Sequence, residues 1–246
     1  MKVYKGICLA CVILAGTSAM ADHLSVSTNA MSFKYSPANG QPSEEANYLY
    51  GFTAKYAHNI FGSKATTDQG AIFANVSVYN GNSNNINLTP PATAGSSSIK
   101  NQIVNTKVGY RQYKNLTSVT LSTQLALGYR YWDRKPSSSQ DEKYQWTYGD
   151  IKIGLDSHLT KKDDLGLTAS YDLAINPTMK ASANDYTLGN TYGYAFSVPY
   201  THSFTAHLSM QISYTYQQWH ISASNTYVPR STTTQSIGSI GLIYNY

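Results

Sequence analysis

The chain has 246 residues, of which only 13% are charged, with 18 Lys and Arg against 13 Asp and Glu. An ordinary soluble domain carries about 25% charged residues, and a soluble all-β protein needs them on its outward strand faces. A net charge of +5 is too weak a bias to indicate a nucleic-acid-binding protein.

Residues 1–21 have the pattern of a secretory signal peptide. Two lysines precede an apolar run over residues 7–15, and small residues end at Ala21. We expect cleavage after Ala21, which leaves a domain of residues 22–246. Because Cys8 and Cys11 both lie in the leader, the mature domain would contain no disulfide or thiolate site.

Ten later segments read as β-strands, because apolar and polar residues alternate with a period of two. They are residues 24–34, 47–58, 70–79, 103–113, 119–131, 143–155, 165–173, 192–200, 206–218 and 235–246. No segment after the leader reaches the ~18 apolar residues of a transmembrane helix, so a membrane location would require a barrel. The 22 tyrosines also suit a membrane interface.

Two of these segments are irregular. In 24–34, Leu24 and Val26 share one face, but Met31 and the apolar residues after it fall on the other. In 143–155, Tyr144, Trp146 and Tyr148 are at even positions, whereas Ile151, Ile153 and Leu155 are at odd positions. We expect bulges near Met31 and at Gly149-Asp150. A count of eight or twelve strands is the alternative.

The segment 206–218 is the clearest strand. Leu208, Met210 and Ile212 alternate with small and amide side chains, and the polar face has no Lys, Arg, Asp or Glu. This pattern is typical of a membrane barrel, whose apolar face meets lipid and whose polar face lines a narrow lumen.

Connection lengths alternate along the chain. Long polar connectors are expected at residues 36–46, 80–102, 133–142, 176–189 and 221–234, and mostly shorter ones at 59–69, 114–118, 157–164 and 201–205. External loops and periplasmic turns of an outer-membrane barrel alternate in this way. The predicted fold is therefore an all-β, transmembrane, antiparallel up-and-down β-barrel of about ten strands.

The chain ends IGLIYNY, which resembles the C-terminal signature of outer-membrane β-barrel proteins. Together with Gly51 in NYLYGFTAKY, the stretch LALGYRYWD and the closing WHIS, it resembles small, functionally uncharacterised outer-membrane β-barrels of Gram-negative bacteria. The resemblance implies location in the cell outer membrane. It also implies that Tyr244 and Tyr246 form a signal for the barrel-assembly machinery, with Tyr in place of the usual terminal Phe.

Placing apolar faces toward lipid turns eight charged side chains into the lumen. They are Lys55, Lys107, Arg111, Arg130, Asp150, Lys152, Asp156 and Asp172. One interpretation is a constriction that selects anions, since five are basic. The other is a set of internal ion pairs in a closed lumen, which the small bore of a ten-stranded barrel favours.

Catalytic and metal sites are not predicted. His220-Ile221-Ser222 faintly resembles the His-x-Ser of lipid A deacylases, but no Asp or Glu follows that could orient the histidine. The loop acids lack the spacing of the omptin proteases and are interpreted as solvated charges; they are Glu44, Glu45, Asp133, Asp141, Glu142 and Asp185. The six histidines are scattered, so no metal or cofactor is expected.

Two surface features complete the functional prediction. Trp132, Trp146 and Trp219 lie near external strand ends and are interpreted as an interfacial girdle. The Asn- and Ser-rich connector 80–102 suits either adhesion to a host ligand or simple screening of the barrel. We predict a surface structural or adhesive protein with a filled lumen, embedded among outer-membrane lipid and lipopolysaccharide. A narrow anion-preferring channel is the alternative, and an enzyme comes third.

Overall fold

The computed structural model describes residues 23–38, 43–62, 68–87, 98–136, 141–181, 184–224 and 230–246. The predicted signal peptide and its cleavage site lie outside these residues. No helix within the described ranges is long and apolar enough to cross a membrane.

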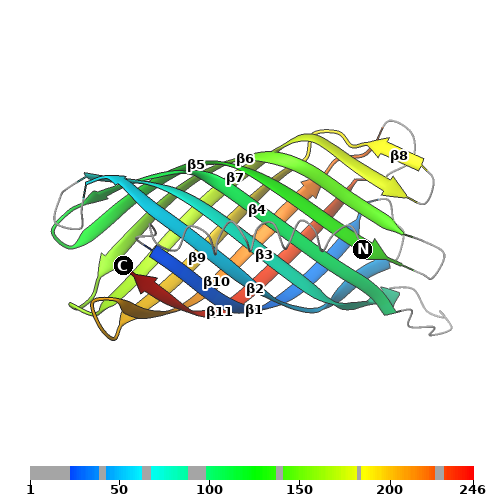
Figure 1. Cartoon of the computed structure of the whole chain (residues 1–246). Coiled ribbons are helices and arrows are strands. Elements are labelled where there is room, and N and C mark those ends of the chain that lie inside the picture. The colour runs from blue at the N-terminus through cyan, green and yellow to red at the C-terminus, as the bar shows by residue number, and fades with distance from the viewer. Residues whose placement is uncertain are drawn as a thin grey trace.

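The described chain consists of β-strands and their connections (Figure 1). The strands are β1 (His23–Pro37), β2 (Ser43–Phe61), β3 (Asp68–Asn87), β4 (Ser98–Asn115), β5 (Val119–Lys135), β6 (Glu142–His158), β7 (Asp163–Ala181), β8 (Asn184–Thr187), β9 (Tyr192–Ser203), β10 (Leu208–Ile221) and β11 (Ser231–Asn245).

Ten of the strands close into one antiparallel barrel, which confirms the predicted fold class and strand count. Neighbours in sequence pair with each other, and β1 pairs with β11 to close the cylinder. The remaining strand, β8, pairs only with the last residues of β7. We call the end of the barrel that carries β8 the loop end and the end that carries Tyr246 the turn end (right and left in Figure 1).

The strands are longer than the sequence pattern predicted. The ten barrel strands contain 12 to 20 residues, whereas about 9–11 tilted residues cross a bilayer. Strands β3 and β4 take up residues 80–87 and 98–102 of the predicted 80–102 loop, and β7 takes up residues 176–181 of another. Several predicted loops are therefore too long, because Asn, Ser and Thr there continue the barrel wall. The rest of the first loop, residues 88–97, lies outside the described residues.

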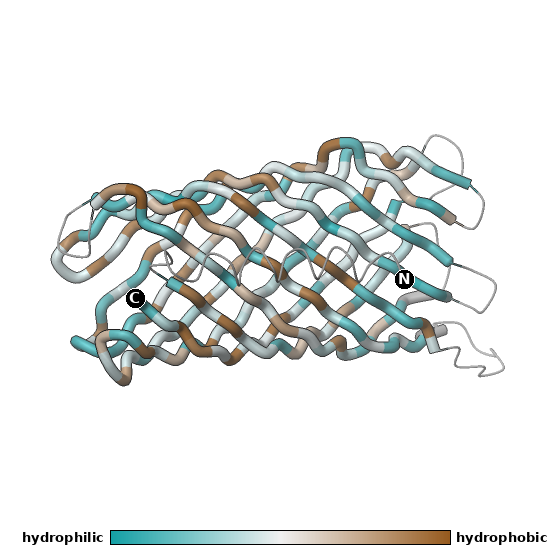
Figure 2. Tube along the Cα trace, viewed as in Figure 1, coloured by the Kyte–Doolittle hydropathy of each residue, from teal (hydrophilic) through white to brown (hydrophobic). Residues whose placement is uncertain are grey.

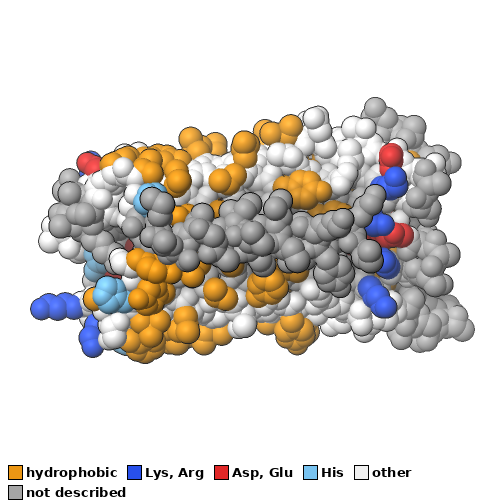
Figure 3. Space-filling model, in the orientation of Figure 1, with side chains coloured by type: hydrophobic (Ala, Val, Ile, Leu, Met, Phe, Trp, Pro, Cys, Tyr) orange, Lys and Arg blue, Asp and Glu red, His pale blue; other side chains and the backbone are white. Residues whose placement is uncertain are grey.

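The outward face carries a belt of large apolar side chains. Leu125 is 62% exposed, Val108 61% and Ile153 60%. On the face seen in Figure 3, charged side chains lie near the two ends of the barrel with hydrophobic side chains between them. Figure 2 shows hydrophobic residues spread along the strands and hydrophilic residues at most strand ends of the loop end. Exposed apolar area on this scale is typical of a surface that meets lipid rather than water.

Neither predicted bulge is present. Strand β1 keeps an uninterrupted register with both β2 and β11, and β6 keeps one with β5. Met31 and Phe33 point into the lumen on the same face as Ser25, and Tyr144 shares the inward face of Asp150. The pattern looks shifted because, toward the loop end, apolar residues leave the outer wall and fill the interior instead.

Register shifts occur instead in β2 against β3, between Asn59 and Phe61, and in β7 against β6. Asn176 has a φ of 50°, and the register with β6 jumps between Gln145 and Thr147. The inserted residue reverses the faces, so that Ile175 points outward but Met179, four residues later, is buried inside. This bulge lets β7 contribute to both the outer belt and the interior.

Candidate functional site in the barrel lumen

The lumen near the loop end is filled by a cluster of buried hydrophobic side chains, which we call the loop-end core. Its members are Met31, Phe33, Tyr35, Leu49, Tyr79, Ile103, Trp132, Tyr144, Trp146, Tyr148, Met179, Leu188, Trp219, Ile221 and Ile237. They come from every barrel strand except β9, together with the segment after β8. The core therefore draws on almost the whole circumference of the barrel.

Aromatic rings of the loop-end core meet across the lumen. The ring centroids of Phe33 on β1 and Trp132 on β5 are 5.5 Å apart. Those of Trp146 on β6 and Trp219 on β10 are 5.1 Å apart. Neither pair of strands is adjacent in the sheet, so these contacts join separate parts of the barrel wall through its interior.

The interpretation of the tryptophans as an interfacial girdle is wrong. Trp132, Trp146 and Trp219 are 0%, 2% and 1% exposed. Each occupies an inward position of its strand, and at this height the outward positions are polar or partly exposed tyrosines. The girdle prediction depended on the position of each tryptophan near a strand end. That position does not tell whether a side chain lies on the inward or the outward face of its strand.

Two glycines make room for the rings. A Cβ on Gly128 would lie 2.3 Å from the Tyr148 ring, and one on Gly193 would lie 2.7 Å from the Trp219 ring. Each ring faces its glycine across a strand pair, since Gly128 pairs with Tyr148 and Gly193 with Trp219. Each ring thus packs directly on the glycine backbone of the neighbouring strand.

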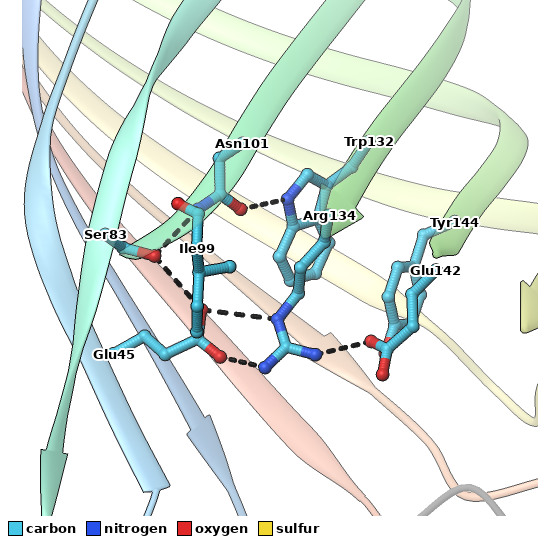
Figure 4. Close-up of polar contacts among 8 residues, drawn as sticks. All are labelled: Glu45, Ser83, Ile99, Asn101, Trp132, Arg134, Glu142 and Tyr144. Carbon is cyan, nitrogen blue, oxygen red and sulfur yellow. Dashed lines mark hydrogen bonds and ion pairs between the residues drawn. The ribbon is translucent and has the colours of Figure 1, made fainter. Parts of the chain in front are cut away.

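A polar network borders the loop-end core (Figure 4). The Arg134 guanidinium contacts both carboxylate oxygens of Glu45 and donates from Nη1 to Glu142 Oε2 at 2.5 Å. Ser83 Oγ donates to Glu45 Oε2 at 3.2 Å. These residues come from β2, β3, β5 and β6.

The same network extends to the indole ring of Trp132. Trp132 Nε1 donates to Asn101 Oδ1 at 2.8 Å, and Asn101 Nδ2 donates to Ser83 Oγ at 2.8 Å. Glu45 is 0% exposed, so its interpretation as a solvated loop charge is wrong. Its partner Arg134 is the next alternate residue of β5 after Arg130 and Trp132, which also point inward. Extending the predicted strand past residue 131 would therefore have predicted that Arg134 points into the lumen.

Midway along the lumen, one lysine joins two carboxylates. Lys107 Nζ lies 2.6 Å from Asp150 Oδ2 and 3.2 Å from Asp172 Oδ1. Gln124 Nε2 donates to the other oxygen of Asp150 at 2.5 Å. Both carboxylates are fully buried, so Lys107, Gln124, Asp150 and Asp172 link β4, β5, β6 and β7 through buried polar contacts.

Arg130 packs against two indole rings that also contact each other. Its Cζ is 5.8 Å from the Trp146 ring centroid and 5.4 Å from that of Trp219, and its Nη1 donates to Asn105 Oδ1 at 3.1 Å. The side chain is 1% exposed. Arg130 therefore stabilises the loop-end core by cation–π contacts and does not line an open pore.

The other predicted lumen charges, Lys55, Arg111, Lys152 and Asp156, are half-buried and lie closer to the turn end. Arg111 donates to Gln124 Oε1 from Nε at 3.1 Å and from Nη2 at 2.7 Å. Among the described residues, no carboxylate lies within ion-pair distance of Lys55, Arg111 or Lys152. All eight predicted residues occupy inward positions, but only three of them form ion pairs.

The residues considered for catalysis are separated from the lumen. The His220 ring stacks on Tyr192 on the outward face, with centroids 4.8 Å apart, and Ser222 Oγ donates to the Asn190 carbonyl. At the turn end, His202 Nδ1 lies 2.7 Å from Asp163 Oδ1. Hydrogen bonds from His202, Thr160 and Tyr200 hold the pKa of Asp163 well below its ordinary value. This group ties together two strand ends.

No family model matches the chain, and no curated protein is similar to it. Several solved structures share its fold. The outer membrane protease OmpT from Escherichia coli aligns with a TM-score of 0.53 and 9% identity, covering 92% of this chain and 97% of that one. The transport unit of the autotransporter AIDA-I from Escherichia coli gives 0.52 and 11%, covering 92% and 90%. The translocator domain of the autotransporter NalP from Neisseria meningitidis gives 0.50 and 12%, covering 100% and 96%. At these identities the likeness shows the barrel fold alone.

Proposed function

We propose that this chain is an integral outer-membrane β-barrel protein with a closed lumen, and that it acts at the cell surface as a structural or adhesive protein. The apolar belt around Leu125, Val108 and Ile153 supports a position in lipid. The polar strand ends beyond the belt support a loop end that projects into water. The neighbouring lipids would be outer-membrane lipid and lipopolysaccharide.

The observation that carries the closed lumen is the loop-end core. Side chains with 0–8% exposure meet from separate parts of the barrel wall, and such packing leaves no continuous water path. A barrel with a closed lumen supports a function at the surface rather than transport through the pore. The five connectors at the loop end, each joining one pair of strands, are the segments that would be displayed there. A host or surface ligand would bind there.

Assembly into the membrane would use the last strand. Tyr244 and Tyr246 are 44% and 55% exposed, and their rings contact each other edge to face with centroids 4.8 Å apart. An accessible aromatic pair at the end of β11 suits recognition by the barrel-assembly machinery. Neither enzymatic activity nor a nucleic-acid partner is part of the proposal.

Planar-bilayer recording tests the closed lumen. We expect the purified protein to give no reproducible unit conductance, whereas Trp146→Ala combined with Trp219→Ala opens a water path and conducts. Ile240→Ala, on the outward face, is the control and should stay silent. Reproducible unit conductance of the unaltered protein would overturn the closed-lumen proposal.

Deletion of residues 88–97 tests the adhesive role. The strands on either side are complete without this connector, so the barrel should still show heat-dependent mobility in detergent gels. We expect binding of cells to immobilised host glycans or matrix proteins to fall several-fold. Unchanged binding by a folded deletion variant would count against adhesion through this loop and favour a purely structural role.

A narrow channel with a mild preference for anions is the second candidate. It is supported by Lys55, Arg111 and Lys152, which are half-buried and without a carboxylate partner among the described residues. This candidate requires conductance in the unaltered protein and a fall in anion preference when these side chains are neutralised. The bilayer recording therefore separates the two functions.

A further inference from the structure

Three side chains at the turn end form a chain of polar contacts across neighbouring strands. Thr120 Oγ1 lies 3.2 Å from Nε2 of His158, and His158 Nδ1 lies 2.6 Å from Oδ1 of Asp164. A hydroxyl, an imidazole and a carboxylate in this order are the parts of a nucleophile, its general base and the group that orients the base. None of the three belongs to the loop-end core.

The register of the sheet holds these groups together. Thr120 is the second residue of β5, His158 is the last of β6, and Asp164 is the second of β7. His158 pairs with Asp164, and Thr120 pairs with Asp156, so His158 is the diagonal neighbour of Thr120 on the same face. The His158 backbone N–H also donates to the Ser118 carbonyl at 3.0 Å. The arrangement therefore depends on the ends of barrel strands and on the turn before β5.

Water reaches the imidazole and the carboxylate. The side chains of His158 and Asp164 are 41% and 40% exposed. A carboxylate beside Nδ1 favours the neutral imidazole that carries its proton there, which leaves Nε2 to accept a proton from Thr120. The hydroxyl has a second acceptor, because Asn115 Oδ1 lies 2.9 Å from Thr120 Oγ1. Rotation about the Cβ–Oγ bond moves the hydrogen from one acceptor to the other.

Two exposed leucines lie on the turns that adjoin this group. Leu116 follows Asn115 in the chain and is 46% exposed, and Leu159 follows His158 and is 56% exposed. They give this end of the barrel apolar surface beside its polar groups. An uncharged substrate with a short acyl chain suits such surroundings better than a charged one.

We propose that Thr120, His158 and Asp164 hydrolyse small carboxylic esters in the water at the turn end. Thr120 Oγ1 bonds to the acyl carbon while its proton passes to His158 Nε2. The ester C–O bond then breaks, and the alcohol leaves with that proton. A water molecule gives a proton to His158 and attacks the acyl-Thr120 ester, which releases the carboxylic acid and returns the proton to Oγ1. Asp164 is a positioning residue that fixes the tautomer of the imidazole and stabilises the imidazolium.

Hydrolysis of p-nitrophenyl acetate by the purified barrel in detergent micelles tests the proposal. We expect turnover above that of micelles alone, and roughly 100-fold lower kcat in Thr120→Ala and in His158→Ala. Asp164→Asn should lower kcat and leave KM unchanged. The matched control is His202→Ala, because its Nδ1 lies 2.7 Å from Asp163 Oδ1, but within the described part of the chain its Nε2 contacts no hydroxyl. The control should keep full activity.

A gain of activity provides a test that misfolding cannot imitate. Thr120→Ser keeps the hydroxyl and removes the methyl group beside it, so kcat should rise several-fold. Heat-dependent mobility in detergent gels shows that each variant is folded. The proposal is overturned if the unaltered barrel gives no turnover, if folded Thr120→Ala keeps its kcat, or if His202→Ala loses as much activity as His158→Ala. The site adds an activity to the proposed surface role and does not depend on the closed lumen.

Discussion

Single residues hold the loop end of the barrel together through buried polar contacts. Arg134 contacts Glu45, 89 positions away in the chain, and Glu142, eight positions away. Glu45 is fully buried, and Arg134 also lies over the Tyr35 ring at 4.8 Å. A charge enclosed in this way depends on its partner, because no water can replace the guanidinium.

Arg134→Met is therefore expected to destabilise the barrel by about 3–5 kcal/mol, since it leaves the Glu45 carboxylate buried without a cation. Equilibrium unfolding by guanidinium in detergent measures the loss. Glu45→Gln added to this variant should restore part of the stability, because the remaining amide carries no charge. A double variant as unstable as the single one would contradict this account.

The glycines beneath the rings give a second prediction at this scale. Gly193→Val places a side chain where the Trp219 ring lies 2.7 Å from the Cβ position, and such overpacking costs about 1–3 kcal/mol. Gly238→Val is the matched control, because its Cβ meets nothing within 4 Å. Thermal unfolding midpoints compare the two. Equal midpoints would show that the ring moves aside freely.

At the scale of the element, the strands differ in how they supply apolar residues to both faces. Strand β6 keeps its register with β5 and changes composition, with Ile151 and Ile153 outward and Tyr144 inward. Strand β7 changes its register instead, through Asn176. Both devices serve the same boundary, where the outward face becomes more polar and the interior becomes apolar.

Deletion of Asn176 should leave Met179 inside, because removing the one extra residue makes the pairing of β7 with β6 regular while the residues on either side keep their faces. Insertion of one Ala after Asn176 should instead turn Met179 to the outside. Met179→Cys, at a position 6% exposed, reports the face through its reaction with a water-soluble maleimide. We expect protection in the intact strand and after the deletion, and labelling after the insertion. Labelling after the deletion would contradict this account of the bulge.

At the scale of the whole molecule, height along the barrel decides the environment of each side chain. Leu125→Arg, in the middle of the apolar belt, should destabilise a lipid-embedded barrel by about 2–4 kcal/mol, whereas Ser32→Arg, outward near the loop end, should cost about 0–1 kcal/mol. Unfolding in lipid vesicles measures both. Equal small costs would contradict the membrane-spanning position.

The sequence by itself determined the barrel. Alternation in segments such as residues 119–131 and 206–218 identified the strands, and their outward residues Leu125 and Ile212 are 62% and 45% exposed. The scarcity of charge and the alternating connector lengths predicted antiparallel closure. These features are local, because successive residues of a strand point to opposite faces of the sheet.

Only the tertiary structure decided what each face meets. Alternation tells which residues share a face, but closing ten strands places Phe33 against Trp132 and Trp146 against Trp219. It also pairs Glu45 with Arg134. Such partners are distant in sequence, and whether the apolar residues of a strand lie on its outward or its inward face depends on their position along the assembled barrel.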